Sequence, residues 1–172
     1  MSSDDGKENI TPYEFITQYI ADKLILTGKA NHELESPEFR ADIYTLIHTQ
    51  PALACKSLLD TLYEKEIQYR RDDSSSDDFF ENLYWCAFLL YRIGDVTDVE
   101  KMWVAKHINM DTGCGFDIQF LLGAGFQETI TYLQTKPFPQ SSEVLDYIMT
   151  CQKSGDFDDM NEWEYGRYEY FK

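Results

Sequence analysis

Apolar residues recur every three or four positions along most of the chain, which is the spacing of one face of an α-helix. The sequence has no stretch of alternating apolar and polar residues bounded by hairpin turns, the pattern of a half-buried strand. Short turns separate the helical stretches, and such turns make consecutive helices antiparallel neighbours. The sequence therefore predicts an all-α fold, a compact stack of seven to nine antiparallel helices.

Residues that favour the first turn of a helix mark the expected start of the first helix. Thr11 lies at an N-cap position before Pro12, and Glu14 completes a capping box. The apolar spacing continues to Leu24, and Gly28 is expected to stop this helix.

The same kind of start signal is repeated further along the chain. Ser36 precedes a proline at the start of the second helix. Thr97 is expected to cap another helix, with Glu100 closing the capping box. Ser141 or Ser142 is expected to cap the last one.

Two neighbouring segments contrast strongly in polarity. Residues 70–78 contain no apolar side chain, which predicts a surface loop. Residues 79–93 are apolar on most faces and are expected to form the most buried helix. Gly94 is expected to end that helix, as Gly155 ends the one that starts at the serine pair.

The whole chain, residues 1–172, is expected to form one helical domain, because its length suits a single hydrophobic core. Residues 1–10 are predicted to be flexible, and residues 156–172 form an acidic, aromatic tail. Residues 93–133 resemble the HEAT-like class of stacked helical pairs: a helix, a Gly-Asp pair, a capped second helix and a glycine turn. The resemblance concerns architecture and implies stacked pairs of helices.

The charge of the chain narrows the range of partners. Thirty-one acidic residues against 15 basic ones give a formal net charge of −16. Such a field repels nucleic acid and anionic membrane surfaces and favours a basic protein partner. No stretch approaches the roughly 20 apolar residues of a membrane span, and the acidic N-terminus is unlike a secretory leader. We therefore expect a cytoplasmic protein.

Cysteine and histidine spacing gives no sign of a metal site. The four cysteines are far apart and form no CxxC pair, so they are expected to be buried thiols rather than ligands or disulfides. The three histidines fall in separate segments without a second ligand one helical turn away. Neither a metal nor another cofactor is expected.

Residues 108–126 gather glycines and possible reactive groups. An enzymatic hypothesis takes Cys114 as the thiolate, His107 as the base, and Asp111 or Asp117 as the orienting carboxylate. The spacing is not diagnostic, because such triads are recognised by their geometry. Both aspartates would also oppose formation of a thiolate.

The same stretch has a simpler interpretation as a packing and turning device. Gly113 and Gly115 would bracket a turn, while Gly123 and Gly125 would let one helix end and the next begin. A phosphate-binding loop would need a preceding strand and a lysine, and a calcium loop from Asn109 would need a later glutamate. The sequence therefore predicts a protein that is not an enzyme.

The C-terminal tail combines carboxylates with aromatic rings. Rings supply contact area and cation–π faces, and carboxylates steer a basic partner and pair with its arginines or lysines. The residues expected to bind a partner are Asp156, Asp158, Asp159, Glu162, Trp163, Glu164, Tyr165 and Tyr168. The alternative is that the aromatic residues fold back and cap the last helical pair.

A small acidic chain without a catalytic motif is similar to bacterial immunity proteins, which neutralise a cognate secreted toxin. The resemblance lies in size, charge and the absence of a motif. It implies that the chain binds the surface of a basic partner directly, and that this partner could be a toxin. An acidic surface can mimic the phosphates that a nuclease expects. The alternatives are a helical-repeat scaffold or adaptor with a continuous concave groove, and an enzyme using Cys114 and His107. A homodimer through the tail is also compatible with the sequence.

Overall fold

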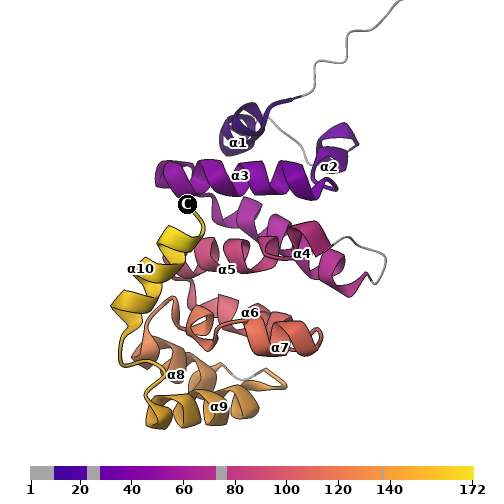
Figure 1. Ribbon diagram of the computed structural model, residues 1–172. Helices are drawn as coiled ribbons and strands as arrows, with labels where there is room; N and C mark the ends of the chain where they lie inside the picture. The colour runs from indigo at the N-terminus through magenta and orange to yellow at the C-terminus, as the bar shows by residue number, and fades with distance from the viewer. Residues whose placement is uncertain (1–9, 23–27, 73–76, 137) are drawn as a thin grey trace, which may run out of the picture.

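A computed structural model describes residues 10–22, 28–72, 77–136 and 138–172 of the chain (Figure 1). All regular elements within these residues are helical, which confirms the predicted all-α class. The α-helices are α1 (Pro12–Ile20), α2 (Lys29–Glu33), α3 (Pro37–Thr49), α4 (Lys56–Arg71), α5 (Asn82–Ile93), α6 (Val99–Lys106), α7 (Met110–Gly115), α8 (Phe126–Thr135), α9 (Ser141–Ser154) and α10 (Met160–Tyr170). None of the helices in these ranges has the length and apolar character that crossing a membrane requires.

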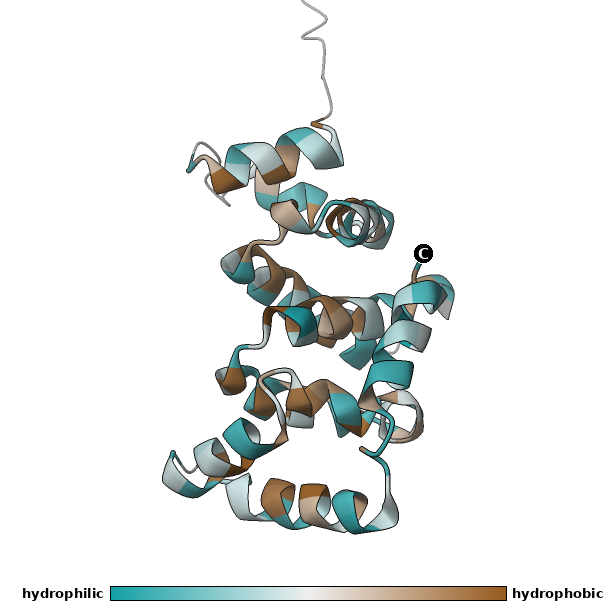
Figure 2. Cartoon of the chain, turned by 90° about the vertical axis from the view of Figure 1, so that its left-hand side faces the viewer, coloured by the Kyte–Doolittle hydropathy of each residue, from teal (hydrophilic) through white to brown (hydrophobic). Residues whose placement is uncertain are grey.

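The helices form successive layers, and α10 runs back along one edge of the stack (Figure 1). Helix α3 contacts α1 and α5, α4 packs along α5, and α8 packs along α9. In the turned view of Figure 2, hydrophobic and hydrophilic segments alternate along most helices, as an amphipathic pattern requires. Helix α10 returns toward the earlier layers, so the C-terminus lies near α3 (Figure 1).

The start of α1 agrees with the sequence, whereas its end does not. Thr11 and Glu14 form the predicted capping box. The helix ends at Ile20 rather than near Leu24, because Asp22 adopts a left-handed backbone conformation with φ of 54°. Leu24 itself lies outside the described residues.

Two of the other predicted caps are wrong. The cap before α6 is Asp95, whose Oδ1 accepts hydrogen bonds from the Thr97 amide at 2.9 Å and the Thr97 hydroxyl at 2.7 Å. An aspartate side chain reaches the amide two residues ahead and favours the tight turn that precedes α6. Helix α9 begins at Ser141 itself, after Gln140, and this start has no side-chain cap. Ser36 does cap α3 through the Phe39 amide, as predicted.

A buried ion pair joins α3 to α4. Arg40 Nε donates to Glu66 Oε1 at 2.6 Å, and both side chains are almost fully excluded from solvent. The same guanidinium donates to the Leu34 carbonyl at 2.7 Å, and Tyr44 Oη donates to Glu66 Oε1 at 2.8 Å. Complete burial raises the pKa of Tyr44 well above its usual value. The donors and acceptors of this cluster therefore satisfy one another inside the core.

A second charged cluster joins α4 to α6 nearer the surface. Asp98 Oδ1 lies 2.8 Å from the ammonium nitrogens of Lys56 and Lys101. Lys56 also bonds Asp60 Oδ1 at 2.6 Å one turn along α4. These contacts fix the two helices side by side through charges that are partly open to water.

Gly123 lies where two backbone segments meet, and we expect Gly123→Ala to destabilise the protein by about 1–3 kcal/mol. A Cβ atom at Gly123 would lie 2.6 Å from the carbonyl oxygen of Tyr91, so α5 would have to shift. Urea unfolding checks this. Gly166→Ala is the matched control, because a Cβ there meets no atom within 4 Å. Equal midpoints for the two variants would contradict the close approach.

Candidate functional site

Helix α10 is amphipathic and packs its inner side on the stack. Its inner residues are half-buried or buried and recur three or four positions apart, namely Met160, Trp163, Glu164, Arg167, Tyr168 and Phe171 just after it. Glu162, Tyr165 and Glu169 are exposed on the other side. The tail is thus a docked helix. Several of its aromatic residues fold back onto the core, but they contact α3, α5 and the segment after α7 rather than capping the last helical pair as the alternative interpretation expected.

Asp117 anchors α10 to the segment that follows α7. Trp163 Nε1 donates to Asp117 Oδ2 at 2.7 Å, and Arg167 Nε donates to the same oxygen at 2.6 Å. The Trp163 ring meets the rings of Tyr91 and Phe120 edge-on, with centroids 5.0 and 5.3 Å away. Trp163 therefore holds the helix in place, and its indole N–H is already used by Asp117.

His48 of α3 lies beneath the other end of α10. Its imidazole stacks on Tyr168 with centroids 4.4 Å apart, and Trp85 borders it edge-on at 6.1 Å. Among the described residues, neither ring nitrogen has a partner with good hydrogen-bond geometry, and the residue is 1% exposed. Burial lowers the pKa of His48, and the positive charge of Arg92 lowers it further.

This lowered pKa predicts that acidification destabilises the protein through His48. At pH values between the lowered pKa of His48 in the folded protein and its ordinary value of about 6.5, the unfolded state binds more protons than the folded state. The free energy of unfolding therefore falls as the pH drops through this range. We expect the urea midpoint to fall more between pH 7.5 and pH 5.5 in the wild type than in His48→Gln. His32→Gln, at an exposed position, should keep the wild-type drop. An identical drop in all three proteins would contradict the assignment.

The outer side of the C-terminal segment carries carboxylates that face solvent. Asp156, Asp158, Asp159 and Glu162 are all exposed. None of them forms an ion pair with a cation in the described ranges. Tyr165 is 67% exposed beside them. We name these five residues the acidic face.

A shallow groove borders the acidic face. It has a volume of about 350 Å³ and is lined by Arg92, Asn161, Glu164, Tyr165 and Tyr168. The Arg92 guanidinium lies 5.4 Å from the centre of the Tyr168 ring. Glu164 accepts a long hydrogen bond of 3.4 Å from Tyr91 Oη. The pKa of Tyr91 is raised to about 12, mainly because the phenol is buried and also because the Glu164 carboxylate is negatively charged.

The eight residues predicted to bind a partner therefore divide between two sides of one segment. The structure brings together the five residues of the acidic face and places Glu164 and Tyr168 along the groove. It turns Trp163 inward. The inner residues could have been predicted, because Met160, Trp163, Arg167 and Phe171 recur three or four positions apart.

The residues of the enzymatic hypothesis do not form a triad. Cys114 is exposed on α7. The His107 Nδ1 atom pairs with the Trp103 carbonyl oxygen at 2.9 Å, and Asp117 is occupied by the α10 contacts. Within the described parts of the chain, no three histidine, cysteine or carboxylate side chains are grouped to hold a metal ion.

The glycine-rich stretch is helical where a turn was expected. Gly113 and Gly115 lie inside α7 without positive φ, so their predicted role at a turn is wrong. Asn109 caps this helix by accepting a hydrogen bond from the Thr112 amide at 3.0 Å. Gly125, with φ of 96°, does allow α8 to begin at once, as predicted.

No family model, curated protein or solved structure matches this chain. The class that the described residues define is thus an all-α protein with a docked C-terminal helix. The HEAT-like resemblance of residues 93–133 and the similarity to immunity proteins stay predictions.

Proposed function

We propose that this chain is a protein-binding module that blocks a basic partner, such as a secreted bacterial toxin, by covering part of its surface. The observation that carries the proposal is the acidic face, with four exposed carboxylates beside a largely exposed tyrosine. The net charge of −16 adds long-range attraction for a cationic surface.

The arrangement divides the work of binding between two kinds of residue. Exposed carboxylates at the edge of an interface mainly raise the association rate, since they act before contact. Tyr165 offers a large, rigid ring beside the carboxylates, of the kind that dominates binding energy in many interfaces. The neighbouring groove gives a partner side chain a place to insert between Glu164 and Tyr168.

The firm docking of α10 makes the proposal testable without disturbing the fold. The inner residues hold the helix, so the acidic face can be altered alone. A deletion of the helix would remove core contacts together with the surface and could not separate the two roles. Substitutions of exposed carboxylates by their amides keep size and capping ability while removing charge.

The experiment begins with capture of proteins from an extract of the source organism at low salt and identification of those that high salt releases. The partner is then purified, and its association rate is measured with the wild type and with D158N/D159N/E162Q. We expect the rate to fall about tenfold and its salt dependence to weaken. The matched control, D42N/E64Q/E128Q, loses the same charge at exposed positions on α3, α4 and α8 and should bind like the wild type.

A second arm tests inhibition itself. Expression of the captured partner should slow bacterial growth, and coexpression of the wild-type chain should restore it. Tyr165→Ala should restore growth less well, because truncation of a hot-spot tyrosine typically costs about 2 kcal/mol of binding. The proposal fails when the retained protein is acidic, or when the acidic-face variant and its control bind equally well.

A further inference from the structure

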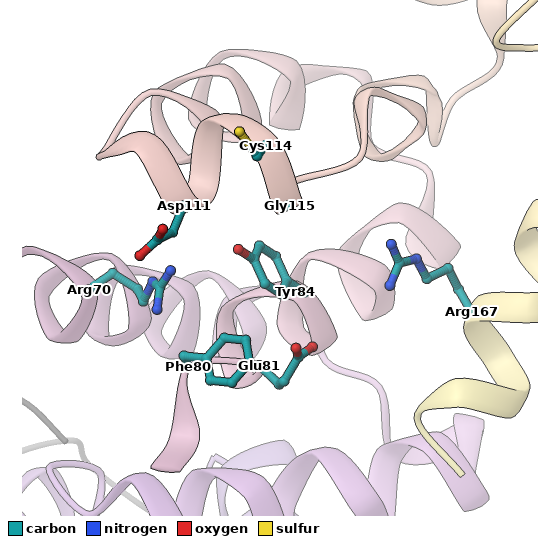
Figure 3. A pocket seen from close by; sticks show the side chains of 8 residues that line it. All are labelled: Arg70, Phe80, Glu81, Tyr84, Asp111, Cys114, Gly115 and Arg167. Carbon is teal, nitrogen blue, oxygen red and sulfur yellow. The ribbon is translucent and has the colours of Figure 1, made fainter. Parts of the chain in front are cut away.

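A pocket of about 670 Å³ lies between α7 and the layer formed by α4 and α5 (Figure 3). Its volume falls within the range of small-molecule sites in proteins. Side chains from four helices and one turn converge on it, namely Arg70, Phe80, Glu81, Tyr84, Asp111, Cys114, Gly115 and Arg167. No role in the proposed partner binding uses these residues, apart from the contribution of Arg167 to the docking of α10.

The charges around this pocket are opposite in sign but not paired with one another. Figure 3 shows Arg70 and Asp111 on one side of the Tyr84 ring, and Glu81 and Arg167 toward the other. Arg70 and Asp111 form no ion pair with each other, and neither do Glu81 and Arg167. The pocket therefore presents both signs of charge to a ligand.

The four charges are not equally available. Arg167 is already neutralised by Asp117. The Arg70 guanidinium lies 5.7 Å from the centre of the Phe80 ring, and its Nε atom is buried with no hydrogen-bond partner among the residues that the structure describes. In this pocket, Arg70 is thus the cation that can bind an acceptor group of a ligand, and Asp111 is the carboxylate that can bind a donor group. Glu81 also interacts with the Tyr170 hydroxyl: burial raises the pKa of that tyrosine, and the Glu81 carboxylate helps to raise it.

Tyr84 places a hydroxyl group in the middle of the pocket. A Cβ atom at position 115 would lie 2.8 Å from the Tyr84 Oη atom, so Gly115 leaves room for this hydroxyl (Figure 3). Burial raises the pKa of Tyr84. The positive charge of Arg70 works against this rise, and the negative charge of Glu81 adds to it. The phenol therefore keeps its proton and can donate a hydrogen bond beside Arg70.

These features disfavour three simple classes of ligand. A multiply charged anion would meet Asp111 and Glu81, as well as the negative field of the whole chain. A simple cation would meet Arg70. A neutral molecule without polar groups would leave the charges desolvated and unpaired, which is unfavourable.

We propose that this pocket binds a small zwitterion that carries one carboxylate and one ammonium group, either a free α-amino acid or a dipeptide. The carboxylate lies against Arg70 and the Tyr84 hydroxyl. The ammonium group lies toward Asp111. The remainder of the ligand extends along the Phe80 ring toward Glu81. This site is separate from the acidic face, so its occupation does not depend on the proposed function.

The test is a titration of the full-length, ¹⁵N-labelled protein followed by ¹H–¹⁵N NMR spectra. The probes are pools of the twenty standard amino acids and pools of dipeptides with a C-terminal glycine, each compound at about 2 mM and pH 7. We expect at least one pool to shift the amides around Tyr84 and Asp111 in a saturable way. The first kind of pool reports a free amino acid, and the second a peptide.

Chemical analogues and protein variants then test the two charges. The N-acetyl derivative of a compound that binds lacks the ammonium group, and its amide derivative lacks the carboxylate. We expect each to bind at least tenfold more weakly. Arg70→Gln and Tyr84→Phe should weaken binding to a similar degree, whereas Arg71→Gln, at the neighbouring exposed position on α4, should leave it unchanged.

Two results would overturn the proposal. One is the absence of saturable shifts with every pool. The other is equal affinity for the parent compound and its two blocked derivatives, which would show that the charges of the pocket are not used. Folding of each variant is checked from its own spectrum, so a loss of binding is not confused with a loss of structure.

Discussion

Replacement of Glu66 by alanine is expected to lower the free energy of unfolding by about 3–5 kcal/mol. The substitution leaves the Arg40 guanidinium buried without its carboxylate and leaves the Tyr44 hydroxyl without its acceptor. A buried charge that has lost its partner is among the most destabilising changes a core can undergo. Urea unfolding followed by circular dichroism measures the effect.

Two further variants separate the ion pair from the helix that carries it. Glu64→Ala removes an exposed glutamate from the same helix and should change stability by less than about 0.5 kcal/mol. The double variant R40M/E66L replaces both charges by apolar groups and should regain most of the stability lost in Glu66→Ala. Equal stabilities for Glu66→Ala and Glu64→Ala would refute the role assigned to the pair.

Trp163→Ala is expected to destabilise the protein by about 3 kcal/mol, toward the lower end of the range for tryptophan truncation because the ring is half-buried. The substitution removes edge-on contacts with Tyr91 and Phe120 and the hydrogen bond to Asp117. Thermal unfolding and the hydrogen exchange of α10 amides measure the loss.

The exposed tyrosine of the same helix provides the matched control. Tyr165→Ala should leave stability within about 0.5 kcal/mol of the wild type, since the ring is 67% exposed. The comparison of Trp163→Ala with Tyr165→Ala therefore tests whether the inner side of α10 stabilises the fold while its outer side stays free to bind a partner. A Trp163→Ala variant as stable as Tyr165→Ala would show that the indole contacts are unimportant.

The helical character of the chain could be predicted from local sequence because apolar spacing and capping residues act within a few positions. Thr11 and Ser36 cap their helices as expected. Thr97 does not, because its own amide and hydroxyl donate to Asp95, which caps the short turn of residues 96–98 before α6. Asp22 ends α1 early through a backbone conformation that no nearby glycine or proline announced.

The candidate sites were less accessible to sequence reasoning because they depend on contacts between distant segments. The exposed carboxylates of the tail could be predicted from composition. The spacing of Trp163 with Arg167 and Phe171 indicates the inner side of α10, but the hydrogen-bond partner of Trp163 could not be inferred, because Asp117 lies 46 positions away. The pocket between α7, α4 and α5 joins Arg70, Tyr84 and Asp111, which lie in three separate segments of the sequence.

The return of α10 along the edge of the stack has a consequence during protein synthesis. In a purely layered array each layer contacts only its neighbours, so early layers can be completed while later ones are still being made. Here His48 and Trp85 are covered by Tyr168 and Phe171. His48 and Trp85 are therefore synthesised well before the rings that cover them, and this aromatic surface stays open until α10 has been made.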